Sequence, residues 1–175
     1  KVNGIHFDSQ YVLASLDVVS LFTNIPVDLA VNSIDRRWDY ISAKTNIIQP
    51  LFYYRYVDDV ILALPSNTID DTLDTFNSLH NRLQFTVEVG TNNKLSFLDT
   101  MLIIDNQRII FDIYHEKTFS GRFFNFHSNH PLYHKKGTTI SFIDKIIHLS
   151  YPRFHQKNLF KFFLIIVILS PSFSP

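Results

Sequence analysis

The sequence predicts an α+β domain in which a small antiparallel sheet carries helices packed on one face. Apolar, aromatic and β-branched runs flank a short acidic pair, a pattern typical of a β-hairpin. Two later stretches place apolar residues at helical spacing, and alternating segments between them indicate further strands. With 175 residues, 46% of them apolar, the chain is long enough to bury one core.

The central hairpin is predicted over residues 51–64, where Asp58 and Asp59 separate two apolar strands. Aspartate is common in turns, so turn chemistry alone would account for the pair. The flanking strands carry almost no polar residues, however, which predicts that both are buried in the sheet. Two like charges at the tip of a buried hairpin repel each other unless a cation neutralises them, and Mg²⁺ prefers carboxylates together with phosphate oxygens.

A third carboxylate, Asp17, ends another apolar run at residues 12–16. An aspartate at the end of a strand can meet Asp58 and Asp59 if the strands are neighbours in one sheet. Three carboxylates on rigid strands suit a two-metal site for phosphoryl transfer, in which one ion activates the attacking oxygen and the other stabilises the leaving group. The sequence therefore predicts a catalytic and metal-binding site at Asp17, Asp58 and Asp59.

Two motifs and three downstream blocks resemble those of reverse transcriptases. Residues 16–26 resemble the first catalytic motif of these enzymes, and Tyr56-Val57-Asp58-Asp59 resembles their aromatic-x-Asp-Asp motif. The blocks at 97–99, 117–122 and 128–131 narrow the resemblance to Penelope-like retroelement reverse transcriptases, relatives of telomerase catalytic subunits. The resemblance covers roughly residues 5–160.

This resemblance implies a reverse-transcriptase palm-like sheet with a partial thumb, acting as an RNA-directed DNA polymerase. Asp17 and Asp58 would bind two Mg²⁺ ions, or Mn²⁺ in their place, with Asp59 assisting. The primer 3′-hydroxyl would attack the α-phosphate of a dNTP. The implied partners are an RNA template and a DNA primer, and the implied location is the nucleus.

The resemblance also implies three substrate-binding residues, Phe22, Tyr56 and Lys94. Phe22 would stack under the incoming sugar and exclude a 2′-hydroxyl, although it could equally be one more buried Phe among 17. Lys94 lies near a motif that can assist pyrophosphate departure. Asp99, in a stretch that resembles the primer grip, could equally cap a turn.

The resemblance breaks between the two catalytic motifs. Only 41 positions separate Asp17 from Asp58, and the interval lacks the family's Gly-rich block, which supports the template strand and the base. This predicts an internal deletion joined near residues 42–50, in a chain that begins partway through a longer reading frame and lacks the upstream fingers. We therefore expect an impaired or inactive polymerase. The alternatives are a non-catalytic nucleic-acid-binding remnant and a relic without selected function.

The net charge of zero hides an asymmetry along the chain. Residues 1–114 hold 8 Lys and Arg against 14 Asp and Glu, whereas residues 115–175 hold 8 against 2. Aromatic residues are interleaved in the basic part, which favours nucleic-acid binding over a merely solvated basic face. The residues assigned to this surface are Lys117, Arg122, Lys135 and Lys136.

The remaining elements follow from local patterns. Helices are predicted from Pro26, from a cap at residues 66–68 with acidic residues in the first turn, and around residues 140–147. Strands are predicted at residues 84–89, 95–99, 101–104 and 108–114.

The predicted organisation is a palm-like core (1–114, shortened near 42–50), a basic thumb-like segment (115–160) and an aberrant apolar tail (161–175). The tail contains an apolar run of 8 residues, far short of the ~20 needed to span a bilayer. No membrane partner is therefore predicted, and a frameshift would explain the tail. The absence of Cys excludes disulfides and thiolate metal sites. The pattern leaves the oligomeric state open.

Overall fold

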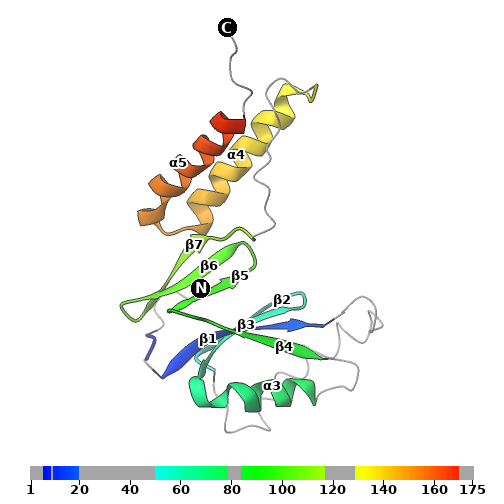
Figure 1. Ribbon diagram of the computed structural model, residues 1–175, viewed down its shortest axis with the longest axis vertical. Coiled ribbons are helices and arrows are strands. Elements are labelled where there is room, and N and C mark those ends of the chain that lie inside the picture. Colours follow the sequence, from blue (N-terminus) through cyan, green and yellow to red (C-terminus); the bar gives the residue numbers. More distant parts are fainter. Residues whose placement is uncertain (1–5, 9, 20–49, 79–83, 117–128, 170–175) are drawn as a thin grey trace. The chain divides into compact units, whose positions relative to one another are not determined.

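The structure is a computed structural model that describes residues 6–8, 10–19, 50–78, 84–116 and 129–169 (Figure 1). These residues form a mixed α+β chain with antiparallel sheets and three helices, which confirms the predicted class at this level. The helix predicted from Pro26 lies outside the described residues. The chain divides into two compact units, residues 1–95 with 104–109 and residues 96–103 with 110–175.

The first unit is built on a four-stranded sheet in the order β2-β3-β1-β4 (Figure 1). Strand β3 is antiparallel to both β1 and β2, and β1 is also antiparallel to β4. All five residues from Val60 to Leu64 in β3 are buried, as the lack of polar residues in this run predicts. The same prediction was wrong for β2, which lies at the edge of the sheet and exposes Tyr54 and Tyr56. The strands are β1 (Tyr11–Val18), β2 (Phe52–Tyr56), β3 (Asp59–Pro65) and β4 (Phe85–Val89).

Helix α3 (Ile69–Asn77) packs on one face of this sheet (Figure 1). Because strand residues alternate between faces, every second residue of β1 and β3 points toward α3. The resulting core contains Ala14, Leu16, Val18, Val60, Leu62, Leu64, Phe76 and Phe85. The residues between them, including Asp17 and Asp59, therefore lie on the other face of the sheet.

The start of α3 differs from the prediction. Residues Ser66–Thr68 form a 3₁₀ turn (η1), and no side chain caps the first turn of α3. The Thr68 hydroxyl instead donates to the carbonyl oxygen of Pro65 at 2.9 Å. The predicted cap was wrong because the chain turns directly out of β3 and uses this hydroxyl within that turn. Asp70 and Asp71 do occupy the first turn of α3, where the helix dipole favours negative charge.

A second sheet has the strand order β5-β6-β7. Its strands are β5 (Lys94–Phe97), β6 (Thr100–Asp105) and β7 (Arg108–Ile113), close to the predicted ranges. The turns between them are tight: Leu98, Asn106 and Gln107 have positive φ angles of 52°, 47° and 64°. Asp99, predicted within a strand or capping a turn, lies in the turn.

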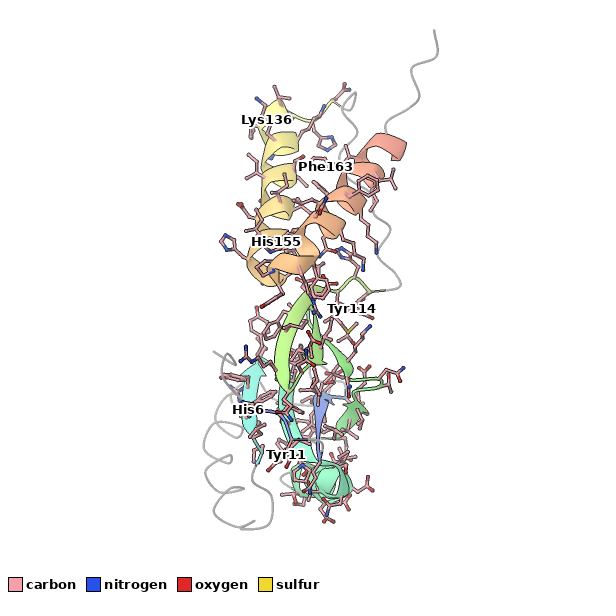
Figure 2. The ribbon with its side chains drawn as sticks, turned by 90° about the vertical axis from the view of Figure 1, so that its left-hand side faces the viewer. His6, Tyr11, Tyr114, Lys136, His155 and Phe163 are labelled. Carbon is pink, nitrogen blue, oxygen red and sulfur yellow. The ribbon has the colours of Figure 1, made fainter. Side chains whose placement is uncertain are left out.

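Helices α4 (Leu132–Leu149) and α5 (Pro152–Leu169) lie side by side in the second unit (Figures 1 and 2). The Phe142 and Phe162 rings stack between them with centroids 4.5 Å apart, and Phe162 is only 1% exposed. Pro152 begins α5, at a position where its missing N–H costs nothing. The helix continues through the predicted boundary between residues 160 and 161, because the apolar run extends the helix instead of starting a separate tail.

In the described ranges, no helix combines the length and the apolar character needed to cross a membrane.

Candidate catalytic site

Antiparallel pairing brings Asp17 and Asp59 together at one end of the four-stranded sheet. Strands β1 and β3 pair from Tyr11 with Pro65 to Leu16 with Val60. One further step along the same register sets Asp17 opposite Asp59. Both lie on the face away from α3, since directly opposed residues share a face. The structure thus satisfies the condition on which the predicted site depends: the two strands are neighbours.

The same row of residues continues onto the two outer strands. Tyr56 of β2 pairs with Asp59, and Thr86 of β4 pairs with Asp17. Across the sheet, the row therefore reads Tyr56, Asp59, Asp17 and Thr86. The Tyr56 side chain is 62% exposed, so its ring is accessible to a bound molecule.

Thr86 is a residue of the site that sequence reasoning missed. Its hydroxyl lies 3.5 Å from the backbone oxygen of Asp17 and donates to it. The alternating pattern of residues 84–89 predicts a strand, but a pattern of this kind does not identify the partner strand or the register. Only the pairing of β1 with β4 places Thr86 beside Asp17.

Asp58 lies in the two-residue turn that joins β2 to β3. The first residue of this turn, Val57, has a φ angle of 55°. Asp58 has no positive φ, so the turn has the φ pattern of type II′, which prefers glycine at its first position. A β-branched residue in this region costs on the order of 1–3 kcal/mol. The candidate site therefore contains local backbone strain next to its carboxylates.

Replacing Val57 by Gly is expected to raise the free energy of unfolding of the first unit by about 1 kcal/mol. Glycine adopts positive φ without steric cost, and the Val57 side chain is 65% exposed, so little packing is lost. Urea unfolding would measure the change. Val57→Ala is the matched control: it keeps a Cβ atom and should gain much less. A less stable Val57→Gly variant would contradict the assignment of strain.

The three carboxylates are close enough to influence one another electrostatically. The pKa of Asp59 is raised above its ordinary value, mainly by partial burial and then by the negative charges of Asp58 and Asp17. Asp17 is exposed and the other two are partly exposed. A cation from solvent can therefore reach the row, and its charge would relieve the repulsion.

The donor atoms of this row suit a hard cation. Mg²⁺ is typically bound through one or two carboxylates plus phosphate oxygens and water. The opposed Asp17 and Asp59 would supply two carboxylates of this type. Within the described residues, however, no three His, Cys, Asp or Glu side chains lie close enough together to hold one ion. The described part of the chain thus contains a pair of candidate ligands with Asp58 nearby, and no preformed three-ligand cluster.

Lys94 is not brought to the carboxylates. It is exposed at the first residue of β5, which follows the end of β4. At that end of β4 the Gly90 amide donates to the carbonyl oxygen of Leu13, whereas Asp17 pairs near the beginning of β4. Most of the length of β4 therefore separates Lys94 from Asp17.

Two of the predicted nucleic-acid-binding residues are described, Lys135 and Lys136. Both lie near the N-terminus of α4, and Lys136 is exposed. They belong to the second unit, whereas the carboxylate row belongs to the first. Phe22, Lys117 and Arg122 lie outside the described residues.

The fold and the site together define an α+β protein with a row of carboxylates at one end of an antiparallel sheet. In comparisons with known proteins, no family model, no curated protein and no solved structure matches this chain.

Proposed function

We propose that the first unit is a palm-like nucleotidyl-transfer domain of the reverse-transcriptase class, from a Penelope-like retroelement. Its reaction would be the extension of a DNA primer on an RNA template, in the nucleus. One observation carries the proposal: the strand register sets Asp17 opposite Asp59, with Asp58 in the adjoining turn. The sequence resemblance assigns catalytic roles to these same three residues.

The three carboxylates and Tyr56 each have a role that follows from their position. Asp17 and Asp59 sit on paired strands, so their carboxylates are held at a spacing set by the sheet. Asp58 is held beside them by the tight turn. The exposed Tyr56 ring, next to Asp59 in the row, offers a flat surface for a sugar or base. Mg²⁺, when bound, would supply the positive charge that neutralises the phosphates.

Primer extension on an RNA template, with dNTPs and with or without Mg²⁺, tests this function. The wild-type chain is expected to extend the primer slowly, because the interval between Asp17 and Asp58 lacks the block that supports template and base. Asp58→Asn should abolish extension. Asp70→Asn is the matched control, because Asp70 is an exposed aspartate in α3 on the other face of the sheet. If folded wild-type protein, verified by circular dichroism, does not extend the primer, the catalytic proposal fails.

A second candidate function is nucleic-acid binding without catalysis. It is favoured by the side chains in the N-terminal part of α4. There the exposed Lys136 follows Tyr133 and His134 by three and two residues, and the centroids of those two rings are 4.2 Å apart. Aromatic and basic side chains together favour single-stranded nucleic acid. This function predicts RNA binding that weakens steeply with salt and does not require Mg²⁺.

A further inference from the structure

One side of α4 exposes large apolar side chains at heptad spacing. Tyr133, Ile140 and Ile147 follow one another at intervals of seven residues and are 70%, 57% and 46% exposed. Residues at this spacing return to the same side of a helix. The opposite side of α4 packs on α5, where Phe142 stacks on Phe162. We call the exposed side the α4 stripe, made of Tyr133, Lys136, Ile140, Asp144 and Ile147.

Two opposite charges within the α4 stripe are placed symmetrically about Ile140. Lys136 lies four residues before Ile140, and Asp144 lies four residues after it; both are exposed. Residues four apart are neighbours on a helix surface, so the three side chains form one continuous ridge. Reversing the direction of the helix about Ile140 exchanges the positive and negative positions. The stripe is therefore complementary in charge to an antiparallel copy of itself.

We propose that the α4 stripe is a self-association surface, on which two copies of this chain pair their α4 helices antiparallel about a two-fold axis beside Ile140. In such an interface, a residue that precedes Ile140 by a given number of positions in one copy faces the residue that follows Ile140 by the same number in the other copy. Lys136 then faces Asp144, Tyr133 faces Ile147, and Ile140 faces itself. Every member of the stripe gains a partner of suitable chemistry.

A second copy fits this surface better than a nucleic acid does. A phosphate backbone would pair with Lys136 but would be repelled by Asp144, and it offers no apolar partner to Ile140 or Ile147. A single pair of helices buries less area than a standard stable interface, so the expected dimer is weak and depends on protein concentration.

Sedimentation equilibrium of the full chain over a range of concentrations tests the pairing. The wild-type chain is expected to shift from monomer to dimer as its concentration rises. Lys136→Glu and Asp144→Lys should each weaken dimerisation by at least about tenfold, because each creates two like-charge pairs in the symmetric interface. An equimolar mixture of the two variants should dimerise again. In the mixed pair, the new carboxylate meets the new ammonium, and the other contact keeps Lys136 against Asp144.

Two further variants make the experiment specific. Ile140→Asp places two carboxylates against each other at the axis and should leave the chain monomeric. Lys157→Glu on α5 changes the net charge as much as Lys136→Glu does, at an exposed position outside the stripe, and should leave dimerisation unchanged. The proposal is overturned if the wild type stays monomeric at every concentration, or if the mixture associates no better than the single variants. It is also overturned if Lys136→Glu weakens RNA binding and leaves dimerisation unchanged, because that result would assign Lys136 to nucleic acid.

Discussion

Replacing Asp17 or Asp59 by Asn is expected to lower Mg²⁺-dependent primer extension by at least about 100-fold. Each change removes one of two opposed carboxylates while preserving the size of the side chain. The strand register is set by backbone hydrogen bonds and buried neighbours, so the row itself should remain. The rate of extension, measured for both variants beside the wild type and Asp70→Asn, provides the test. An effect of less than a fewfold would show that the row does not carry the chemistry.

Metal affinity gives this prediction a measure that is independent of turnover. Calorimetric titration with Mn²⁺ should show binding to the wild-type chain that is weakened about tenfold or more in Asp17→Asn. Asp70→Asn should bind as the wild type does, because Asp70 is an exposed residue of α3, which packs on the opposite face of the sheet. If both variants bind Mn²⁺ equally, Asp17 is not a ligand.

Asp59→Asn should raise the stability of the fold although it lowers the rate of primer extension. Because the pKa of Asp59 is raised in the folded chain, the folded state holds a proton on this group more tightly than the unfolded state does. At neutral pH the ionised carboxylate therefore opposes folding, and this penalty fades as the pH falls through the raised pKa toward the ordinary value of about 4. In the presence of EDTA, Asp59→Asn should be more stable than the wild type at pH 7. The gain should be no more than about 0.5 kcal/mol, because solvent screens the repulsion at this partly exposed group. The gain should be absent at pH 3.

The second large effect concerns the core, where Phe76→Ala is expected to lower the free energy of unfolding by about 3–5 kcal/mol. Phe76 is 2% exposed, and its ring meets that of Phe85 edge to face with centroids 5.2 Å apart. Removing it leaves a cavity between α3 and the sheet. A domain of this size is stable by only about 5–15 kcal/mol, so the loss is a large part of the total.

Phe76 also lies next to a second link between α3 and β4. The Asn77 side chain accepts a hydrogen bond from the Phe85 amide at 2.6 Å. Loss of the Phe76 ring should therefore loosen β4, the strand that places Thr86 beside Asp17. Urea unfolding would measure the effect. Phe160→Ala, at a side chain that is 69% exposed, is the control and should change stability by no more than about 0.5 kcal/mol. Equal losses in the two variants would contradict the assigned core.

Local patterns were sufficient for most of the elements. The apolar runs around Asp58 and Asp59 predict the hairpin that the structure forms as β2 and β3. The helical spacing and the acidic first turn predict α3. Alternation predicts β4, and apolar runs separated by turn residues predict β5 to β7, all within a residue or two. These predictions succeed because helix and strand periods are expressed within a few consecutive residues. The cap of α3 was predicted wrongly, because a hydroxyl such as that of Thr68 can form a hydrogen bond with any of several nearby backbone groups.

The sequence pattern alone identified Asp17, Asp58 and Asp59 as carboxylates at the ends of apolar runs, but it left open whether they meet. Only the pairing of β1 with β3 sets Asp17 opposite Asp59, and only the pairing with β4 adds Thr86. The strain at Val57 and the complementary charges of the α4 stripe likewise emerge from backbone conformation and from exposure. The physical reason is the same in each case. Strand partners, turn type and the side that a helix leaves exposed depend on contacts between residues far apart in the chain, and no local period encodes those contacts.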